Sequence, residues 1–366
     1  MSEIRLDRLR KEFKETVAVE GVTFTFKSSA VTCLLGPSGC GKTTMMRMIA
    51  GLEEPTSGDV YFDDERVTEL PTRKRRIGMV FQYPVVYAGI SVRENIELPL
   101  MHERLAEQER ARRVEEVVEI LRLKEDVNTN VSRLDMATRQ KVAVAREIAR
   151  QPRFILFDEP ITNVDVETKI QIRRALRVLT RQRRQTIIYV THDQTDAMTL
   201  ADEIVLMNAG RIVQCAEPRT LYDSPADVFG GWFLGNPGMN FFEQDVVITD
   251  GVGRIASPLF PCPVLVTGRE LAERVVLGIR PEHAEIHSEP TPQAVPACIE
   301  RRTIGVGGQY LLAIRVGGRP IKVKVSPEVG TRIGEMAWLT CPLGWIRVFG
   351  TDGRRKDVEL REEARS

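Results

Sequence analysis

One stretch, residues 36–43 with the sequence GPSGCGKT, constrains the fold more than any other part of the chain. It follows the apolar run 30–35 and precedes a run of helix-forming residues, so it stands where a strand turns into a helix. Glycines without a Cβ let the backbone N–H groups of such a turn point at an anion, and the start of the next helix adds partial positive charge. The pattern therefore predicts a phosphate-binding loop in an α/β domain.

The chemistry of this loop assigns separate roles to its residues. We expect Lys42 to reach the β- and γ-phosphates of a nucleotide, and the hydroxyl of Thr43 to bind Mg²⁺. The remaining phosphate contacts are expected from Gly36, Pro37, Ser38, Gly39, Cys40, Gly41 and Thr44. The alternative is a glycine-rich turn that happens to contain Lys-Thr, and the strand before it and the helix after it disfavour that alternative.

Polar side chains also follow two further buried strands. Asp158 and Glu159 come directly after the apolar run 154–157, and His192 follows the apolar run 186–190. Ligands bind at the carboxyl ends of parallel strands. We expect Asp158 in the Mg²⁺ shell, Glu159 polarising a water towards the γ-phosphate, and His192 contacting that phosphate. The alternatives are a solvated acidic turn and a structural histidine.

Two more site residues are expected outside these strands. The strand predicted over 77–81 ends at Gln82, whose neutral carboxamide can bind Mg²⁺ and orient a water without adding charge. Phe13 stands in a polar neighbourhood 23 positions before Gly36. We expect its ring to stack on adenine, and the alternative is a small local core.

The rest of the chain predicts two domains. Apolar residues at three- and four-residue intervals indicate amphipathic helices, so residues 83–150 are expected as an all-helical subdomain inside an α/β nucleotide-binding domain over 1–235. The basic run 73–76 is expected on a solvated face. Short β-rich pieces punctuated by Gly and Pro predict a second domain over 236–366, a small oligosaccharide-binding-type barrel that regulates or dimerises, with a frayed charged tail.

Composition narrows the class of protein. The chain has 366 residues and a net charge of +1 from 52 basic and 51 acidic side chains, so no nucleic-acid partner is expected. No run approaches the roughly 18 apolar residues of a membrane-spanning helix. The charged start MSEIRLDRLRKEF has no apolar signal-peptide core, and we expect a cytoplasmic location.

Taken together, these motifs resemble the nucleotide-binding subunits of ABC importers in the maltose-type, sugar-uptake branch. The resemblance covers nearly the whole chain and includes GPSGCGKT, VFQ with Gln82, FDEP with Asp158 and Glu159, the loop Thr162 to Asp165, THD with His192, and LGIRPEH at 277–283. It implies a RecA-like parallel sheet core, an antiparallel β subdomain and a helical insertion, followed by an OB-like TOBE domain. It also implies ATP and Mg²⁺ as cofactors, and nucleotide contacts from Asp165 and from the signature loop beginning at Leu134.

By the same resemblance such subunits dimerise head to tail and hold two ATP molecules between them. Their partners would be two membrane-spanning permease subunits, met by residues 83–100, and an extracytoplasmic solute-binding protein reached through the complex. The subunit would lie on the cytoplasmic side of the membrane. The segments FQYPVVY and NPGMN are similar to those of polyol and glycerol importers, so the expected solute is a carbohydrate or polyol, with glycerol as one candidate.

One motif departs from the family. The signature loop LSGGQ reads LDMAT here, with Asp135 in place of the serine and Met136 and Ala137 in place of two glycines. A carboxylate about 4 Å from a phosphate oxygen costs about 4 kcal/mol at an effective dielectric of about 20. The ATP facing this loop should be poorly clamped, unless Asp135 is protonated or turned away. We therefore expect a heterodimer with a second ATPase whose signature loop is intact.

Two other functions fit parts of the pattern. One is a soluble ABC-type ATPase acting in DNA repair or on ribosomes, which the single phosphate loop and the absence of sustained heptads disfavour. The other is a regulatory ABC subunit with weak hydrolysis, suggested by LDMAT alone. Glu159 and His192 argue against it, since a subunit without catalysis needs neither.

Overall fold

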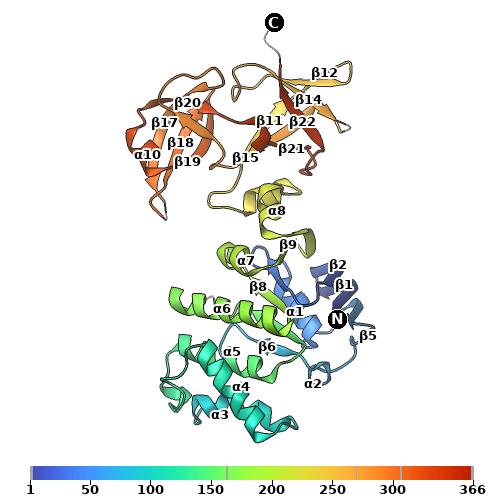
Figure 1. The fold of residues 1–366 in the computed structure, drawn as a ribbon. Coiled ribbons are helices and arrows are strands. Elements are labelled where there is room, and N and C mark those ends of the chain that lie inside the picture. Colours follow the sequence, from blue (N-terminus) through green and yellow to red (C-terminus); the bar gives the residue numbers. More distant parts are fainter. Residues whose placement is uncertain (1–2, 162–163, 269, 306, 364–366) are drawn as a thin grey trace. The chain divides into compact units, whose positions relative to one another are not determined.

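The computed structural model describes residues 3–161, 164–268, 270–305 and 307–363. The chain divides into two compact units, Met1–Arg219 and Thr220–Ser366. Each unit has its own buried apolar cluster. Figure 1 shows helices and strands together in the first unit and mainly strands in the second. Among the described residues, no helix is both long enough and apolar enough to cross a membrane.

An antiparallel sheet forms the amino-terminal part of the first unit. Its order is β2-β1-β4-β5, with β1 (Ile4–Phe13), β2 (Thr16–Phe26), β4 (Ser57–Phe62) and β5 (Glu65–Arg66). Strand β2 runs without a break through Gly21, which has a φ of +63°. This sheet is the antiparallel β subdomain that the resemblance implied.

A six-stranded sheet forms the centre of the first unit. Its order is β10-β9-β3-β8-β7-β6, with β3 (Val31–Leu35), β6 (Gly78–Val80), β7 (Phe154–Asp158), β8 (Thr186–Thr191), β9 (Glu203–Asn208) and β10 (Arg211–Ala216). All neighbouring pairs are parallel except β9 and β10. Apolar side chains fill both faces of β3, β7 and β8, as buried parallel strands require.

The strand register brings four carboxyl ends to one edge of this sheet. Leu35 lies opposite Thr191, Asp158 opposite Val190, and Val80 opposite Phe157. The segments that follow β3, β8, β7 and β6 therefore leave the sheet side by side. This is the edge at which ligands bind in open parallel sheets.

Helix α1 (Lys42–Ala50) joins the two sheets of the first unit. Its buried Met45, Met46 and Ile49 belong to one apolar cluster with residues of β1, β4, β7, β8 and β9. The helix ends at Gly51, whose left-handed φ of +74° allows its N–H to bond back into the last turn. The helix that carries Lys42 is thus held between both sheets.

The last turn of α1 is capped by an arginine from a neighbouring segment. Arg75, in α2 (Thr72–Arg75), is only 5% exposed. Its guanidinium donates hydrogen bonds to the carbonyls of Met48 and Ile49 at 2.7 and 2.8 Å, and to those of Thr68 and Leu70 at 2.8 Å each. The expectation of a solvated basic run is therefore wrong for Arg75, because four carbonyl oxygens replace water around it.

The segment between β6 and β7 is helical, as predicted. It contains α3 (Val92–Glu97), η1 (Leu98–His102), α4 (Glu107–Ile120), η2 (Val131–Arg133) and α5 (Met136–Arg150). Ser91 and Glu94 form a capping box at the start of α3. Two further helices, α6 (Val166–Arg183) and α7 (Gln194–Leu200), lie on either side of β8 in the sequence.

The second unit is built on antiparallel strands. Its sheets are β11-β15-β21, β12-β13-β14-β22 and β16-β20-β17-β18-β19. The strands are β11 (Asn240–Asp245), β12 (Val247–Thr249), β13 (Val252–Ile255), β14 (Val264–Gly268), β15 (Arg274–Ile279), β16 (Glu285–His287), β17 (Val295–Ile304), β18 (Tyr310–Val316), β19 (Arg319–Val325), β20 (Met336–Thr340), β21 (Arg347–Phe349) and β22 (Val358–Glu362). The short helices are α8 (Pro218–Asp223), α9 (Val228–Phe233), α10 (Pro327–Arg332) and η3 (Leu343–Trp345).

Two features of this unit differ from the sequence-based expectations. Residues 358–362 are not frayed, since β22 pairs with β14 from Val264↔Glu362 to Gly268↔Val358. The chain also divides at 219/220, earlier than the predicted boundary at 235/236. Arg280 explains this, because its buried guanidinium donates to the carbonyls of Tyr222 and Leu234 and so holds the connecting segment on the β-rich unit.

Candidate nucleotide site

The loop between β3 and α1 can be built only with glycine at two positions. A Cβ on Gly36 would lie 2.2 Å from the carbonyl oxygen of Met207, and a Cβ on Gly41 would lie 2.1 Å from that of Ala18. Gly41 also has a φ of +102°, which other residues rarely adopt. The backbone is therefore packed tightly on both sides while Ser38 and Gly39, at the top of the loop, stay exposed.

The ammonium group of Lys42 is held inside this loop. Its Nζ donates to the carbonyls of Gly36 and Pro37 at 2.9 and 2.8 Å and lies 3.7 Å from Sγ of the buried Cys40. The side chain is 4% exposed. A cation held by neutral carbonyls at the start of a helix, next to half-buried Thr43 and Thr44, is placed to exchange those carbonyls for phosphate oxygens.

Two oxygen ligands of the kind that Mg²⁺ prefers lie together at the base of the loop. The hydroxyl of Thr43 donates to Oδ1 of Asp158 at 3.1 Å. Asp158 is 6% exposed, and this burial raises the pKa of its carboxyl, although the bond from Thr43 acts in the opposite direction. A bound divalent cation would compensate the buried negative charge, so the donor set fits Mg²⁺.

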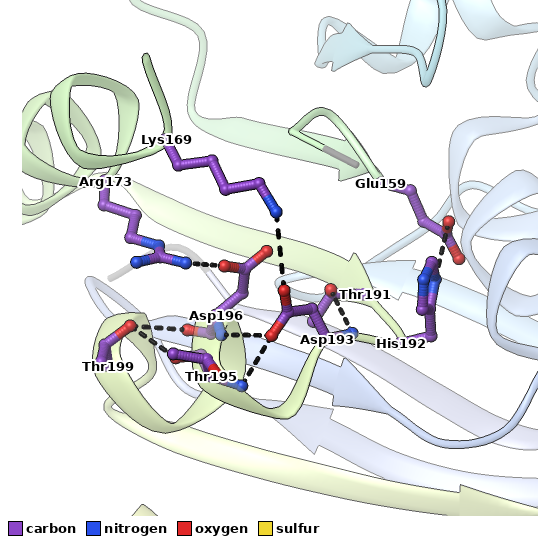
Figure 2. A network of polar contacts seen from close by, with 9 residues as sticks. All are labelled: Glu159, Lys169, Arg173, Thr191, His192, Asp193, Thr195, Asp196 and Thr199. Atoms are coloured by element: carbon purple, nitrogen blue, oxygen red, sulfur yellow. Dashed lines mark hydrogen bonds and ion pairs between the residues drawn. The ribbon is translucent and has the colours of Figure 1, made fainter. Parts of the chain in front are cut away.

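Glu159 and His192 meet across the ends of β7 and β8. Nδ1 of His192 lies 3.0 Å from Oε2 of Glu159 (Figure 2). Glu159 has a φ of +46°, unusual for a residue with a side chain, and its N–H donates to the carbonyl of Val190 at 3.0 Å. Strained backbone of this kind gathers at functional sites. Here it turns the carboxylate of Glu159 towards the neighbouring strand end.

A polar network fixes the segment that carries His192, as Figure 2 shows. Asp193 accepts from the backbone N–H groups of Thr195 and Asp196 and so caps α7. Lys169 and Arg173 of α6 pair with Asp193 and Asp196, the first at 3.6 Å. This support was not predicted, although an Asp before a helical run is a capping signal in the sequence.

Gln82 and Phe13 are both exposed, as their expected roles require. Gln82 follows β6, so it leaves the sheet next to Asp158 on β7. Phe13 is 44% exposed at the end of β1, with Nζ of Lys11 4.8 Å from its ring centroid. Phe13 therefore does not belong to a local core, and its ring is free to contact a planar ligand.

The predicted signature loop leads into helix α5. Asp135 is the N-cap of this helix, with Oδ1 accepting from the N–H of Thr138 at 2.6 Å, and this bond lowers the pKa of the carboxyl. Leu134 before it is half-buried. Asp165 caps α6 in the same way through Thr168, which lowers the pKa of Asp165. Thr162, at the start of the loop that includes Asp165, lies outside the described residues.

Comparison with known proteins gives relatives along the whole chain. The family model described as ABC transporter matches residues 19–162. The trehalose/maltose import ATP-binding protein MalK of Thermococcus litoralis is 38% identical over 95% of this chain and 98% of its own length. The sn-glycerol-3-phosphate import ATP-binding protein UgpC 2 of Agrobacterium fabrum is 36% identical over 100% of this chain and 98% of its own length.

Solved structures match the first part of the chain. A dimeric post-hydrolysis state of the ATP-binding cassette MJ0796 bound to ADP and Pi is 29% identical, with a TM-score of 0.53, and the match covers 59% of this chain and 99% of that one. With relatives that span both units at more than one-third identity, the chain belongs to the ATP-binding proteins of the ABC transporter family.

Proposed function

We propose that this chain binds and hydrolyses ATP to drive an importer for a carbohydrate or polyol. The observation that carries the proposal is the contact between Glu159 and His192 beside the Thr43–Asp158 pair, because a chain that only bound nucleotide would not need a carboxylate and an imidazole aligned at the phosphate end. The named import functions of the relatives, trehalose/maltose and sn-glycerol-3-phosphate, support the class of solute. Glycerol is one candidate within that class.

Each residue of the site has a defined part in this proposal. Lys42 and the loop N–H groups bind the phosphates, and Phe13 stacks on the adenine. Thr43, Asp158 and Gln82 would hold Mg²⁺, which would supply charge neutralisation at the phosphates. Glu159 orients the attacking water and accepts its proton, and His192 holds that carboxylate in place.

The partners follow from the surface beyond Gln82. Tyr83, Val85 and Tyr87 are 65%, 56% and 51% exposed, so several large apolar side chains meet solvent within one short segment. Exposed apolar groups that cluster in this way indicate a protein contact. We assign the contact to two membrane-spanning permease subunits, with a solute-binding protein on the outer side. The chain would then sit peripherally on the cytoplasmic face of the membrane.

The variant Glu159→Gln tests the proposed chemistry. It keeps the shape and one hydrogen-bonding oxygen but cannot accept a proton, so ATP turnover should fall at least about 100-fold while ATP binding is retained. Glu125→Gln, an exposed change away from the site, should leave both unchanged. Equal turnover by the two variants would overturn the assignment. Co-purification with permease subunits separates an importer from a soluble ATPase.

A second part of the proposal concerns the partner ATPase. Asp135 is the N-cap of α5 and its pKa is lowered, so it is ionised at neutral pH and presents a negative charge where the family has a serine. Asp135 therefore stays charged at neutral pH, and protonation does not remove its repulsion of a phosphate group. We propose a heterodimer in which a second ATPase provides the competent signature loop. The names of the relatives mention no second ATPase, so this pairing rests on Asp135 and its two neighbours alone.

Restoring the family's loop tests this pairing. The triple change Asp135→Ser, Met136→Gly and Ala137→Gly should raise the ATP turnover of the purified chain, because it removes the charge and lets backbone approach the phosphate. Asp227→Ser is the matched control, since Asp227 caps α9 through the N–H of Gly230 at 2.7 Å and lies in the second unit. Rapid, cooperative turnover by the unaltered chain on its own would count against a heterodimer.

A further inference from the structure

One face of α5 is bonded to the segment that runs from β6 into the exposed apolar loop. Nε2 of Gln140 donates to the carbonyl of Phe81 at 3.1 Å. Arg146 donates to the carbonyl of Val85, and its guanidinium lies 4.6 Å from the centroid of the Tyr87 ring. These contacts come from one helix and fall on either side of Gln82.

A third contact of α5 reaches the strand before Gln82. The carboxylate of Glu147 lies against β6, where a Cβ on Gly78 would stand 3.1 Å from its Oε2. Gln140 and Glu147 are seven positions apart, two helical turns, so they lie on the same face of α5. The backbone on both sides of Gln82 is thus bonded to side chains of one rigid element.

Gln140 is costly to bury, which makes its bond to Phe81 informative. The residue is 1% exposed, and Oε1 of its amide has no hydrogen-bond partner within the part of the chain that the structure describes. An apolar side chain of the same size would fill this space without an unpaired oxygen. The presence of an amide at position 140 is therefore explained by the hydrogen bond that its nitrogen donates to the carbonyl of Phe81, the residue immediately before Gln82.

We propose that Gln140 is a positioning residue for Gln82. Its bond to Phe81 ties the backbone before Gln82 to α5, and the position of α5 therefore sets whether the carboxamide of Gln82 reaches the Mg²⁺–nucleotide site. Because Arg146 of the same helix bonds the carbonyl of Val85, α5 holds the backbone on both sides of Gln82. This inference rests on the proposed function for its chemical consequence. The bond between Gln140 and Phe81 can be tested without it.

The first test uses Gln140→Met in the full-length chain without nucleotide. Methionine has a similar volume but no donor, so hydrogen exchange of the backbone amides over 82–87 should become about three- to tenfold faster. The matched control is Gln185→Met. Gln185 is 5% exposed, donates to the carbonyl of Pro152 at 2.8 Å, and also has an unpartnered Oε1, but it lies away from Gln82. Unchanged exchange over 82–87 in Gln140→Met overturns the proposal.

The second test asks whether Gln140 acts through Gln82. ATP affinity is measured with Mg²⁺ and with EDTA for Gln140→Met, Gln82→Ala and the double variant. We expect the affinity gained from Mg²⁺ to fall about three- to tenfold in Gln140→Met and the EDTA value to stay the same. In the Gln82→Ala background, Gln140→Met should cause no further loss, whereas Gln185→Met should have the same small effect in both backgrounds.

Additive losses from Gln140→Met and Gln82→Ala would show that Gln140 does not act through Gln82 and would overturn the proposal. Failure of the proposed function itself would look different: the unaltered chain would show no Mg²⁺-dependent ATP affinity, while the exchange difference at 82–87 would persist. The bond would then be structural only, and a positioning role for Gln140 would be excluded.

Discussion

The imidazole of His192 and the carboxylate of Glu159 lie 3.0 Å apart although 33 residues separate them in the sequence. The contact exists because β7 and β8 are parallel neighbours whose ends are level, with Asp158 opposite Val190. Glu159 is 19% exposed at its side chain and His192 49%, so water reaches both groups. The pair is therefore accessible to a water molecule and a phosphate from the open side of the sheet edge.

Removing the imidazole should leave Glu159 without its orienting partner. We expect His192→Ala to lower the rate of ATP turnover about 100-fold and to change ATP affinity little, because the phosphate loop is untouched. Single-turnover hydrolysis and equilibrium binding measure the two quantities separately. His102→Ala, at an exposed position in η1, is the control and should match the unaltered chain. Normal turnover in His192→Ala would remove this residue from the site.

The apparent Mg²⁺ affinity in ATP turnover should depend on the hydroxyl of Thr43 more than on the size of the side chain. Thr43→Val keeps the shape but leaves Asp158 without its donor and removes one oxygen ligand, so the apparent Mg²⁺ affinity in ATP turnover should fall about tenfold. Thr43→Ser retains the hydroxyl and should stay within about twofold of the unaltered chain. A Mg²⁺ titration of turnover compares the three. If valine and serine behave alike, the hydroxyl is not a ligand.

Crowding around Gly41 predicts a large effect on folding of the loop. Gly41→Ala would place a Cβ 2.1 Å from the carbonyl of Ala18 at a φ of +102°, so backbone must move. We expect the first unit to lose about 3 kcal/mol of stability and the chain to lose ATP binding. Gly21→Ala is matched in having a positive φ, +63°, but no atom lies within 4 Å of its Cβ. It should cost only about 1 kcal/mol and bind ATP normally, as denaturant unfolding and binding assays can show.

The buried carboxyl of Glu147 predicts a pH effect. Burial raises its pKa above the ordinary 4.5, against the opposing charges of Arg150 and Arg146. A carboxyl with a higher pKa in the folded state binds its proton more tightly there. Its stabilising contribution is complete below pH 4.5 and is lost as the pH rises through the raised value.

Glu147→Gln removes this titration and keeps the size of the side chain. The melting temperature of the variant should therefore rise relative to that of the unaltered chain as the pH increases from 4.5 to 8, in a thermal-unfolding series. The control Glu125→Gln changes an exposed carboxyl and shows how much of any difference comes from losing one acidic side chain. A constant difference for Glu147→Gln would contradict the raised pKa.

Local patterns were enough to predict the elements that bind phosphate. Runs such as FILFDEP and GPSGCGKT specify a buried strand, a tight turn and a helix within a few residues, so their structure depends little on distant parts of the chain. The helical character of 83–150 was also predictable, because period-3.6 patterning is a local property. The structure confirms the strands before Gly36, Asp158 and His192 and the helices α4 and α5.

What the sequence could not predict depends on contacts between distant segments. Nothing local shows that Arg75 leaves solvent to bind the end of α1, or that Gln140 reaches Phe81, 59 residues earlier. The chain divides earlier than the predicted 235/236 boundary for a similar reason, since Arg280 donates to the carbonyls of residues 222 and 234, 58 and 46 positions before it. The tail strand β22 was missed because its charged sequence becomes a strand only through pairing with β14.

The guanidinium of Arg75 is shared by the end of α1 and by the turn after β5. The carbonyls that a helix leaves open in its last turn would otherwise admit solvent between the two sheets. The guanidinium of Arg75 thus satisfies these open carbonyls in place of water. Loss of Arg75 would leave carbonyls of both the turn after β5 and the end of α1 without a donor, so the ends of these two segments depend on a single side chain.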